Sequence, residues 1–310
     1  MLGRVMAIAM NTYREAVRAR ILYGLLGFAL ATTVYSLVVA TLSLRQEARV
    51  VADIGVASTS LYAVLVAIVL SATSLHRELE LKTVFPILTR RLRRHEYLVG
   101  KYLGTLATLS VFIALNGATV LAILAFEGGQ KPILVGGVVL LMAGILAVTM
   151  IRAKYTRIFV GLPWSYALFL IMVVLSKPAG AERQLVVASA ALTMCEVAVV
   201  AAVATLFASF SSPFLTAVFT LGVFAVGRSA DTLGNLPART FGAAVHSTGH
   251  VLASIFPNLQ VYVPARPLLL GQVNESPLWP FVGAAAANAL FYAAILLTFS
   301  ALVFRKRDFQ

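Results

Sequence analysis

The sequence holds a single cysteine, Cys195, and only 12% of its 310 residues are charged. One cysteine excludes an intrachain disulfide and a cysteine-rich metal site. The scarcity of charge, together with 60% hydrophobic residues and a mean hydropathy of +0.91, excludes a soluble domain of this length. We therefore expect a polytopic membrane protein.

The sequence also lacks a nucleotide-binding loop. A P-loop needs G-x-x-x-x-G-K-[ST], because its backbone amides surround the phosphates and its hydroxyl binds magnesium. The one Gly-Lys pair, Gly100-Lys101, is followed by Tyr102 and has His95 at the required upstream glycine position. No cofactor is expected on this chain, and any ATP hydrolysis that drives it would belong to another polypeptide.

Eight apolar runs predict an all-α, polytopic membrane helix bundle of about eight transmembrane helices. We expect one transmembrane domain over residues 1–310, and every run but the seventh has the roughly 17–25 residues that a spanning helix needs. The runs cover residues 21–44, 54–75, 102–126, 132–151, 158–176, 185–210, 213–226 and 279–304.

The distribution of basic residues predicts the orientation. Eight spans place both termini on one side, together with residues 76–101 and the loop at 152–157. That side carries 17 of the 25 Lys and Arg residues, and the other side carries eight. The positive-inside rule then predicts that both termini are cytoplasmic. It also assigns the net charge of +13 to loops rather than to nucleic-acid binding.

Shorter helices are predicted at both membrane surfaces. Residues 1–20 carry apolar side chains such as Tyr13 on one face and arginines on the other, which predicts an amphipathic helix among the lipid headgroups. It is either a generic basic anchor or a structured elbow helix. Residues 228–278, on the outer side, contain five prolines and therefore no long helix, but a short amphipathic helix is expected near 238–256.

A charged island occupies residues 76–101, with seven of the basic and three of the 12 acidic residues of the chain. Its arginine cluster alone is typical of a solvated cytoplasmic loop. Glu78 and Lys82 have the i,i+4 spacing that supports a helix, and Pro86 predicts a bend. A charged helix held between two spans is suited to contact a soluble partner.

The stretches SLHRELELKTVFPIL and RRHEYLVGKYLG in this island resemble the cytoplasmic segment after the second span of ABC-2-type transporter permeases. IFPNLQVY at 255–262 and the closing VFRKRDF resemble the outer and C-terminal segments of the same family. The resemblance covers the N-terminal helix, the first three and last three spans, and the tail. The chain departs from the family by Arg91, where a proline is usual, and by an apparent extra helix pair at 132–176.

The resemblance implies the membrane subunit of an ATP-driven exporter in the bacterial cytoplasmic membrane. Two permease chains, identical or related, would form the pathway, and two ABC-type ATP-binding subunits would hold ATP and Mg. Residues 76–101 would be the coupling helix between the second and third spans. The residues that the resemblance places at the docking surface are Arg77, Glu78, Glu80, Lys82, Arg90, Arg91 and Glu96. The alternative is a membrane scaffold of an envelope assembly machine, with accessory proteins and no transported solute.

Polar residues inside the spans are the other candidate site. Glu196 lies in the sixth span, where a charge costs at least about 2.5–3.5 kcal/mol, and Ser189 and Thr193 share its helical face. These residues line a substrate path or dimer interface, or Glu196 is a protonated or hydrogen-bonded acid that only packs helices. Asn116 and Asn288 have the same two interpretations, with interhelical hydrogen bonding favoured.

Histidines give only a weak signal. His246 and His250 have an i,i+4 spacing that can bind zinc or copper, but no third ligand is evident, and we expect no metal site. The expected spans contain neither histidine nor lysine and no pair of acids. An intramembrane enzyme is therefore not expected, because a nucleophile would lack its base.

Overall fold

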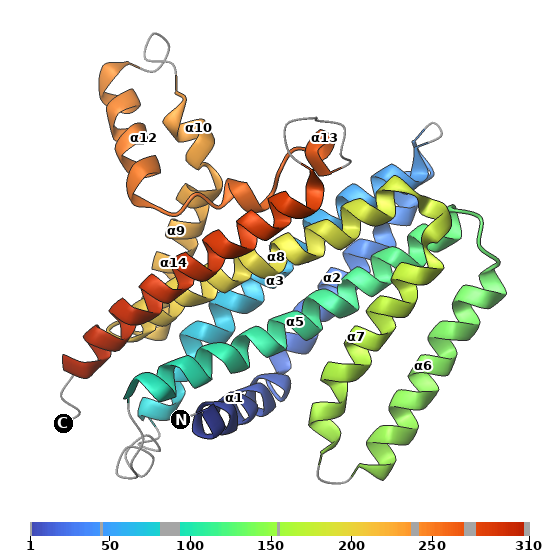
Figure 1. Cartoon of the computed structure of the whole chain (residues 1–310), viewed down its shortest axis with the longest axis horizontal. Coiled ribbons are helices and arrows are strands. Elements are labelled where there is room, and N and C mark those ends of the chain that lie inside the picture. The colour runs from blue at the N-terminus through green and yellow to red at the C-terminus, as the bar shows by residue number, and fades with distance from the viewer. Residues whose placement is uncertain are drawn as a thin grey trace.

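The computed structural model describes residues 2–43, 46–80, 94–153, 156–236, 242–269 and 277–306. Every regular element in these ranges is a helix. Long apolar helices dominate the arrangement (Figure 1). The prediction of an all-α, polytopic helix bundle is confirmed.

Within these ranges, seven helices are long and apolar enough to cross a membrane. They are α2 (Arg20–Ala40), α3 (Glu47–Glu80), α5 (Arg94–Glu127), α6 (Pro132–Arg152), α7 (Arg157–Leu175), α8 (Ala181–Ala208) and α14 (Leu278–Lys306). The predicted seventh span is α9 (Pro213–Arg228), which has only 16 residues. It would extend about 24 Å at 1.5 Å per residue, which is shorter than the roughly 30 Å hydrocarbon core.

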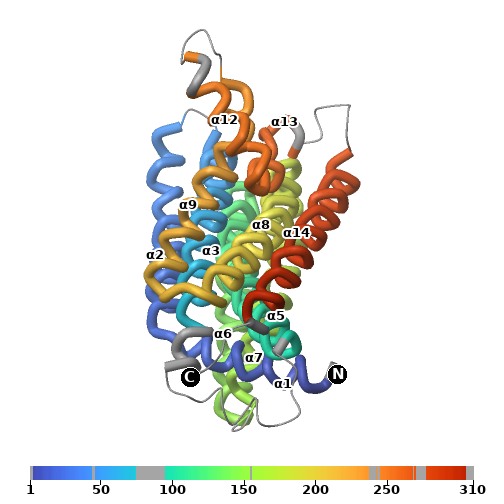
Figure 2. The backbone as a smooth tube through the Cα atoms, turned by 90° about the vertical axis from the view of Figure 1, so that its left-hand side faces the viewer, coloured from blue at the N-terminus to red at the C-terminus, as the bar shows by residue number. Residues whose placement is uncertain are grey.

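The elements divide between two ends of the bundle (Figures 1 and 2). The α1 end carries α1 (Leu2–Val17), the end of α3, the start of α5 and the end of α14. The opposite end, called the distal end below, carries the short helices α10 (Ala230–Gly234), α12 (Ala243–Ile255), η2 (Gln260–Tyr262) and α13 (Arg266–Leu269). In both views α9 runs from the α1 end toward the distal end, as the predicted chain order requires.

Three helices form the core. In the most apolar stretch of α3, 61% of the residues are buried, and in those of α5 and α8 the share is 67%. The corresponding share in α6 and in α7 is 11%. Alanines and valines of α8, such as Ala188, Ala201 and Val197, are fully buried, so the three backbones pack closely. Small residues favour such contacts between membrane helices, because the backbones can approach each other.

Helices α6 and α7 form a peripheral hairpin beside this core (Figure 1). They occupy the region that the sequence marks as an extra helix pair. The Trp164 indole donates a hydrogen bond to the Met142 carbonyl oxygen at 2.8 Å, which ties the two helices together. Their remaining contacts with the core run mainly through α5.

Helix α1 lies across the bundle axis and packs against α5 (Figure 2). Tyr13 is 1% exposed, and Ala9, Thr12 and Ala16 are also buried. The predicted N-terminal helix therefore forms and is packed against the bundle. Part of its predicted apolar face remains outside the core, because Met6 is 62% exposed and free to contact lipid.

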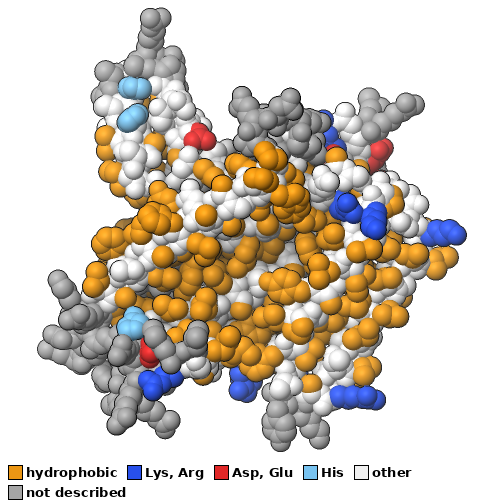
Figure 3. All heavy atoms as spheres, viewed as in Figure 1, with side chains coloured by type: hydrophobic (Ala, Val, Ile, Leu, Met, Phe, Trp, Pro, Cys, Tyr) orange, Lys and Arg blue, Asp and Glu red, His pale blue; other side chains and the backbone are white. Residues whose placement is uncertain are grey.

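The surface has a broad apolar band. Hydrophobic side chains cover the middle of the face drawn in Figure 3, and the Lys and Arg side chains visible there lie near the ends of the helices. Exposed residues of this kind include Phe28, Leu140, Leu170 and Phe291. Such a band matches the hydrocarbon core of a bilayer, with charges at the headgroups.

Candidate functional site

A buried ion pair lies between α8 and α9. Glu196 is completely buried, and one of its carboxylate oxygens binds the Arg228 guanidinium at the C-terminal end of α9. Its other oxygen accepts a hydrogen bond of 2.8 Å from the Ser60 hydroxyl of α3. Three helices therefore meet at one carboxylate, and the guanidinium offsets the cost of burying its charge.

A second charged group ties the distal segment to the core. Arg266 of α13 binds Asp53 of α3 with one guanidinium nitrogen and Glu182 of α8 with another. Asp53 also pairs with Arg49 at 3.9 Å on the surface of α3. The other oxygen of Glu182 is buried and has no hydrogen-bond partner among the described residues.

Both charged groups border one cavity of about 230 Å³ in the distal half of the bundle. Ser189 and Thr193 of α8 line it, beside Ser60, Arg228 and Arg266. The predicted polar face of α8 therefore borders a cavity through Ser189 and Thr193, although Glu196 does not line it and apolar residues such as Val56 and Leu185 form much of its wall. It is called the polar cavity below. A cavity with hydroxyls, guanidinium groups and carboxylates can bind a small polar or zwitterionic group at membrane depth.

Tyr262 of η2 closes this cavity from the distal side. It is 4% exposed, and burial, followed by the neighbouring Cys195, Tyr292 and Glu196, raises the pKa of its phenol to about 12. The hydroxyl therefore stays neutral at physiological pH and keeps its proton for hydrogen bonding.

Asn116 belongs to a separate network nearer the middle of α5. Its amide donates to the Thr59 hydroxyl at 2.7 Å, and its carbonyl oxygen accepts from the Thr33 hydroxyl at 3.1 Å. Thr33 in turn lies 3.2 Å from the Ser58 hydroxyl. These bonds join α2, α3 and α5, which is the interhelical bonding favoured for Asn116 and places it outside the polar cavity.

Asn288 lies on the exposed face of α14, away from the cavity. Gly283 on the same helix has open space around it, whereas the face toward the core consists of Val282, Ala285, Ala289 and Ala293. The structure therefore does not bring Asn288 together with Glu196. Asn288 is exposed, and its role at a dimer interface stays a prediction.

The predicted docking residues are only partly described. Arg77, Glu78 and Glu80 lie in the last turn and a half of α3, which extends past the apolar run. Lys82, Arg90 and Arg91 lie outside the described residues, as does Pro86. The described ends of the island therefore belong to two core helices, because α3 ends at Glu80 and α5 begins at Arg94.

Glu96 does not fit a docking surface. Its side chain is 4% exposed, because the first turns of α5 pack into the bundle together with Tyr97 and Leu98, both 1% exposed. Tyr97 stacks on Phe304 of α14 with a centroid distance of 6.3 Å. Lys101 is also buried and donates to the Ser74 carbonyl oxygen at 2.5 Å. Lys101 therefore holds α5 against α3.

The two histidines lie on or near a helix surface at the distal end. His246 Nδ1 lies 2.7 Å from the Leu236 carbonyl oxygen, and His250 is exposed. Among the described residues, no group of three or more metal-ligating side chains comes together.

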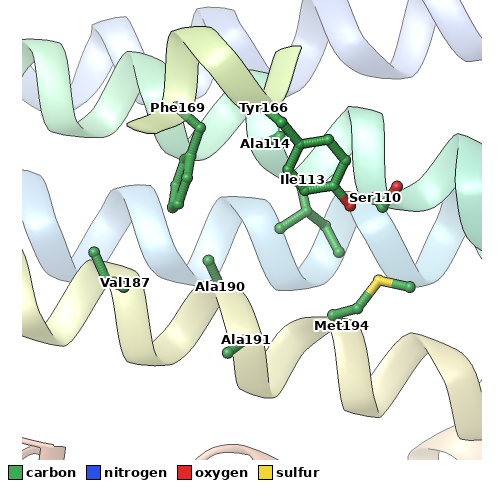
Figure 4. A pocket seen from close by; sticks show the side chains of 9 residues that line it. All are labelled: Ser110, Ile113, Ala114, Tyr166, Phe169, Val187, Ala190, Ala191 and Met194. Carbon is green, nitrogen blue, oxygen red and sulfur yellow. The ribbon is translucent and has the colours of Figure 1, made fainter. Parts of the chain in front are cut away.

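A second cavity, of about 280 Å³, lies between α5, α7 and α8 (Figure 4). Its lining is almost entirely apolar, and Figure 4 shows Phe169, Ile113 and Met194 around it. Ser110 and Tyr166 provide the hydroxyls of this lining. The cavity can accept an apolar group, but it brings no charged side chain to it.

Sequence reasoning missed the basic partner of Glu196. Arg228 lies two residues after the apolar run 213–226, in the predicted outer segment, but α9 extends to Arg228 and carries it to the cavity. A buried acid implies a partner cation, and Arg228 stands at the end of the neighbouring apolar run. Asp53 and Arg266 carried no such signal, because both lie outside the predicted apolar runs.

The fold and the buried charged cluster define a polytopic α-helical membrane protein with a polar site inside its bundle. A scan against models of protein families and a search of curated proteins both found no match.

Proposed function

We propose that the chain is the permease subunit of an ATP-driven ABC-2-type transporter, most simply an exporter, that works as a dimer. The sequence resemblance supplies the family and the dimer. The observation that carries the proposal is the position of the described ends of this segment, because residues 76–80 end the core helix α3 and residues 94–101 begin the core helix α5, both at the α1 end. A partner that pushes on this segment acts directly on the core.

Helix α3 provides the mechanical connection. Glu78 and Glu80 lie near one end of α3, and Asp53 and Ser60 contact the polar cavity near the other. The 25 residues from Asp53 to Glu78 correspond to roughly 37 Å of continuous helix at 1.5 Å per residue. Tilting of α3 would change the distances between Ser60 and Glu196 and between Asp53 and Arg266, and so open or close the cavity.

ATP hydrolysis belongs to the partner in this account. The sequence has no P-loop, so ATP and Mg would bind the ATP-binding subunits, two per permease dimer. The basic side of the chain, with both termini, would face the cytoplasm. Helix α1 would lie among the headgroups on the same side, where its arginines suit anionic lipids.

The test is co-purification of the tagged chain with an ABC-type ATP-binding protein in mild detergent. We expect wild type to retain the ATPase and the double variant Glu78→Arg/Glu80→Arg to lose it, because both charges in the docking segment are reversed. The matched control is Glu47→Arg/Glu127→Arg, which reverses two carboxylates at the distal ends of α3 and α5. Loss of the ATPase in both double variants, or its absence from wild type, would reject the docking segment.

The scaffold alternative predicts the same ATPase partner. The two functions separate in reconstituted vesicles, because a transporter needs the polar cavity. The double variant Glu196→Leu/Arg228→Met, which leaves no unpaired buried charge, should abolish transport while the ATPase remains bound. ATP hydrolysis by the complex that is unaffected by candidate substrates and by this double variant would favour the scaffold.

A further inference from the structure

A cavity between α1, α2, α5, α6 and α7 has no role in the proposed transport step. It measures about 730 Å³, within the roughly 300–1,000 Å³ of small-molecule sites. The peripheral hairpin forms one wall, with Met150 and Ile151 of α6 and Trp164 of α7, and α1 closes the end at Tyr13. Tyr23 and Ile151 are 58% and 76% exposed, so the cavity opens to the lipid-facing surface.

The cavity combines an apolar interior with a basic rim. Leu26, Leu115 and Leu146 line its interior, and Arg157 is its charged lining residue. Aromatic residues lie near this rim, where Tyr13 stacks on Phe159 at 6.0 Å between centroids. Trp164, seven residues after Arg157 on α7, lines the wall further inside. Tyrosine and tryptophan concentrate where hydrocarbon meets headgroups, so the rim lies at headgroup depth.

The charge around the cavity has one sign. The sequence has no acidic residue between Glu15 and Glu47, which covers α2, or between Glu127 and Glu182, which covers α6 and α7. At the α1 end these segments expose the arginines Arg18, Arg20, Arg152 and Arg157. Glu15 borders a different, smaller cavity that it shares with Thr73 of α3 and Thr105 of α5.

We propose that this cavity binds one anionic phospholipid, with an acyl chain inside the cavity and the phosphate at Arg157. The proposal needs only that the chain spans a bilayer, and it is independent of the ATPase partner. An acyl chain fits the apolar lining that faces the bilayer, and the acid-free basic rim selects a negative headgroup. The bound lipid fills the space between the core and the α6–α7 hairpin.

Trp164 provides a reporter inside the site, since the sequence has only two tryptophans and Trp279 is removed by Trp279→Phe. The single-tryptophan protein is reconstituted in phosphatidylcholine vesicles that contain brominated phosphatidylglycerol or brominated phosphatidylcholine at equal mole fraction. Quenching of Trp164 should give an affinity for phosphatidylglycerol about fivefold higher, the effect of one basic residue near a headgroup. Equal quenching by the two lipids would overturn the proposal.

Two pairs of variants test whether the lipid selectivity arises in this cavity. Arg157→Gln should bring the selectivity to about one, while Arg152→Gln, in the same loop but outside the lining, should keep it. Gly161→Leu fills the cavity, because a Cβ there already lies 3.4 Å from the Tyr13 hydroxyl, and should reduce quenching by both lipids. Gly144→Leu on α6 projects into open space and should leave quenching unchanged.

Two further outcomes would contradict the lipid site, and each has its own cause. Equal loss of selectivity in Arg157→Gln and Arg152→Gln would mean that the loop charge attracts lipid without this site. Trp164 shielded from both lipids, more strongly at higher protein density, would mean that a second chain covers the cavity. If Gly161→Leu fails to fold, the two arginine variants decide the matter.

Discussion

Replacing Arg228 by alanine is expected to destabilise the protein by about 3–5 kcal/mol, the cost of leaving a buried charge without its partner. Glu196 is completely buried, and without Arg228 its carboxylate would keep only the 2.8 Å hydrogen bond from Ser60. The measurement is unfolding in a fixed detergent, compared with Arg49→Ala. The Arg49–Asp53 pair is about half exposed on both sides, so this control should cost less than about 1 kcal/mol.

The double variant Glu196→Leu/Arg228→Met completes this test. Removing both charges leaves no uncompensated ion, so most of the lost stability should return. The pair would then hold the helices together without being essential for folding, and any loss of transport in the double variant would belong to function. An Arg228→Ala protein as stable as wild type would contradict the buried ion pair.

The second large effect is expected from Gly104→Ala in α5. A Cβ at this position would lie 2.5 Å from the Ala9 carbonyl oxygen and 2.6 Å from the Thr12 Cβ, so α1 would have to move away. Overpacking of this kind costs typically about 1–3 kcal/mol. The expected result is a lower melting temperature and faster tryptic cleavage after Arg14 and Arg18, because α1 would no longer pack closely against α5.

In the control variant, Gly283→Ala, the expected change in stability has the opposite sign. Gly283 lies in the interior of α14, and a Cβ added there would meet no other atom within 4 Å. Alanine is favoured over glycine in a helix interior by roughly 0.8–1.0 kcal/mol, so Gly283→Ala should be neutral or stabilising. If Gly104→Ala behaves like Gly283→Ala, α1 does not pack on α5 as described.

The spans were predictable because hydropathy alone defines them. The run at 132–151 becomes α6 (Pro132–Arg152) and the run at 213–226 becomes α9 (Pro213–Arg228), with shifts of one or two residues. The runs do not reveal where a helix continues beyond the apolar band. Helix α3 extends to Glu80 although its apolar run ends at residue 75, because charged residues can continue a helix that its own backbone bonds already hold.

The site was predictable on one helix and not between helices. The spacing of Ser189, Thr193 and Glu196 places them on one face of α8, and the structure puts the first two on the cavity wall. The partner Arg228 is 32 residues away from Glu196 in sequence, and Ser60 is 136 residues away. Periodicity within a helix does not show which neighbouring helix its polar face will contact. These partners can therefore be identified only from the packed structure.

Glu96 shows the opposite limit. Its sequence context, beside arginines in a charged island, favours a surface, but Glu96 is only 4% exposed, and the neighbouring Tyr97 stacks on Phe304 of α14. A charged residue next to a span is exposed or buried according to the third helix that packs there. For Tyr97 that helix is α14, whose Phe304 comes about 200 residues later in the chain, and nothing local to the island identifies it.

The most direct test of the account is a photo-crosslinking residue placed at Glu78 in intact cells, with the same residue at Glu127 on the distal end as its control. Crosslinked proteins are identified by mass spectrometry. The account predicts that position 78 captures an ABC-type ATP-binding protein and that position 127 does not. Capture of that ATPase at position 127, or at neither position, would contradict a permease that is coupled to its ATPase through residues 76–101.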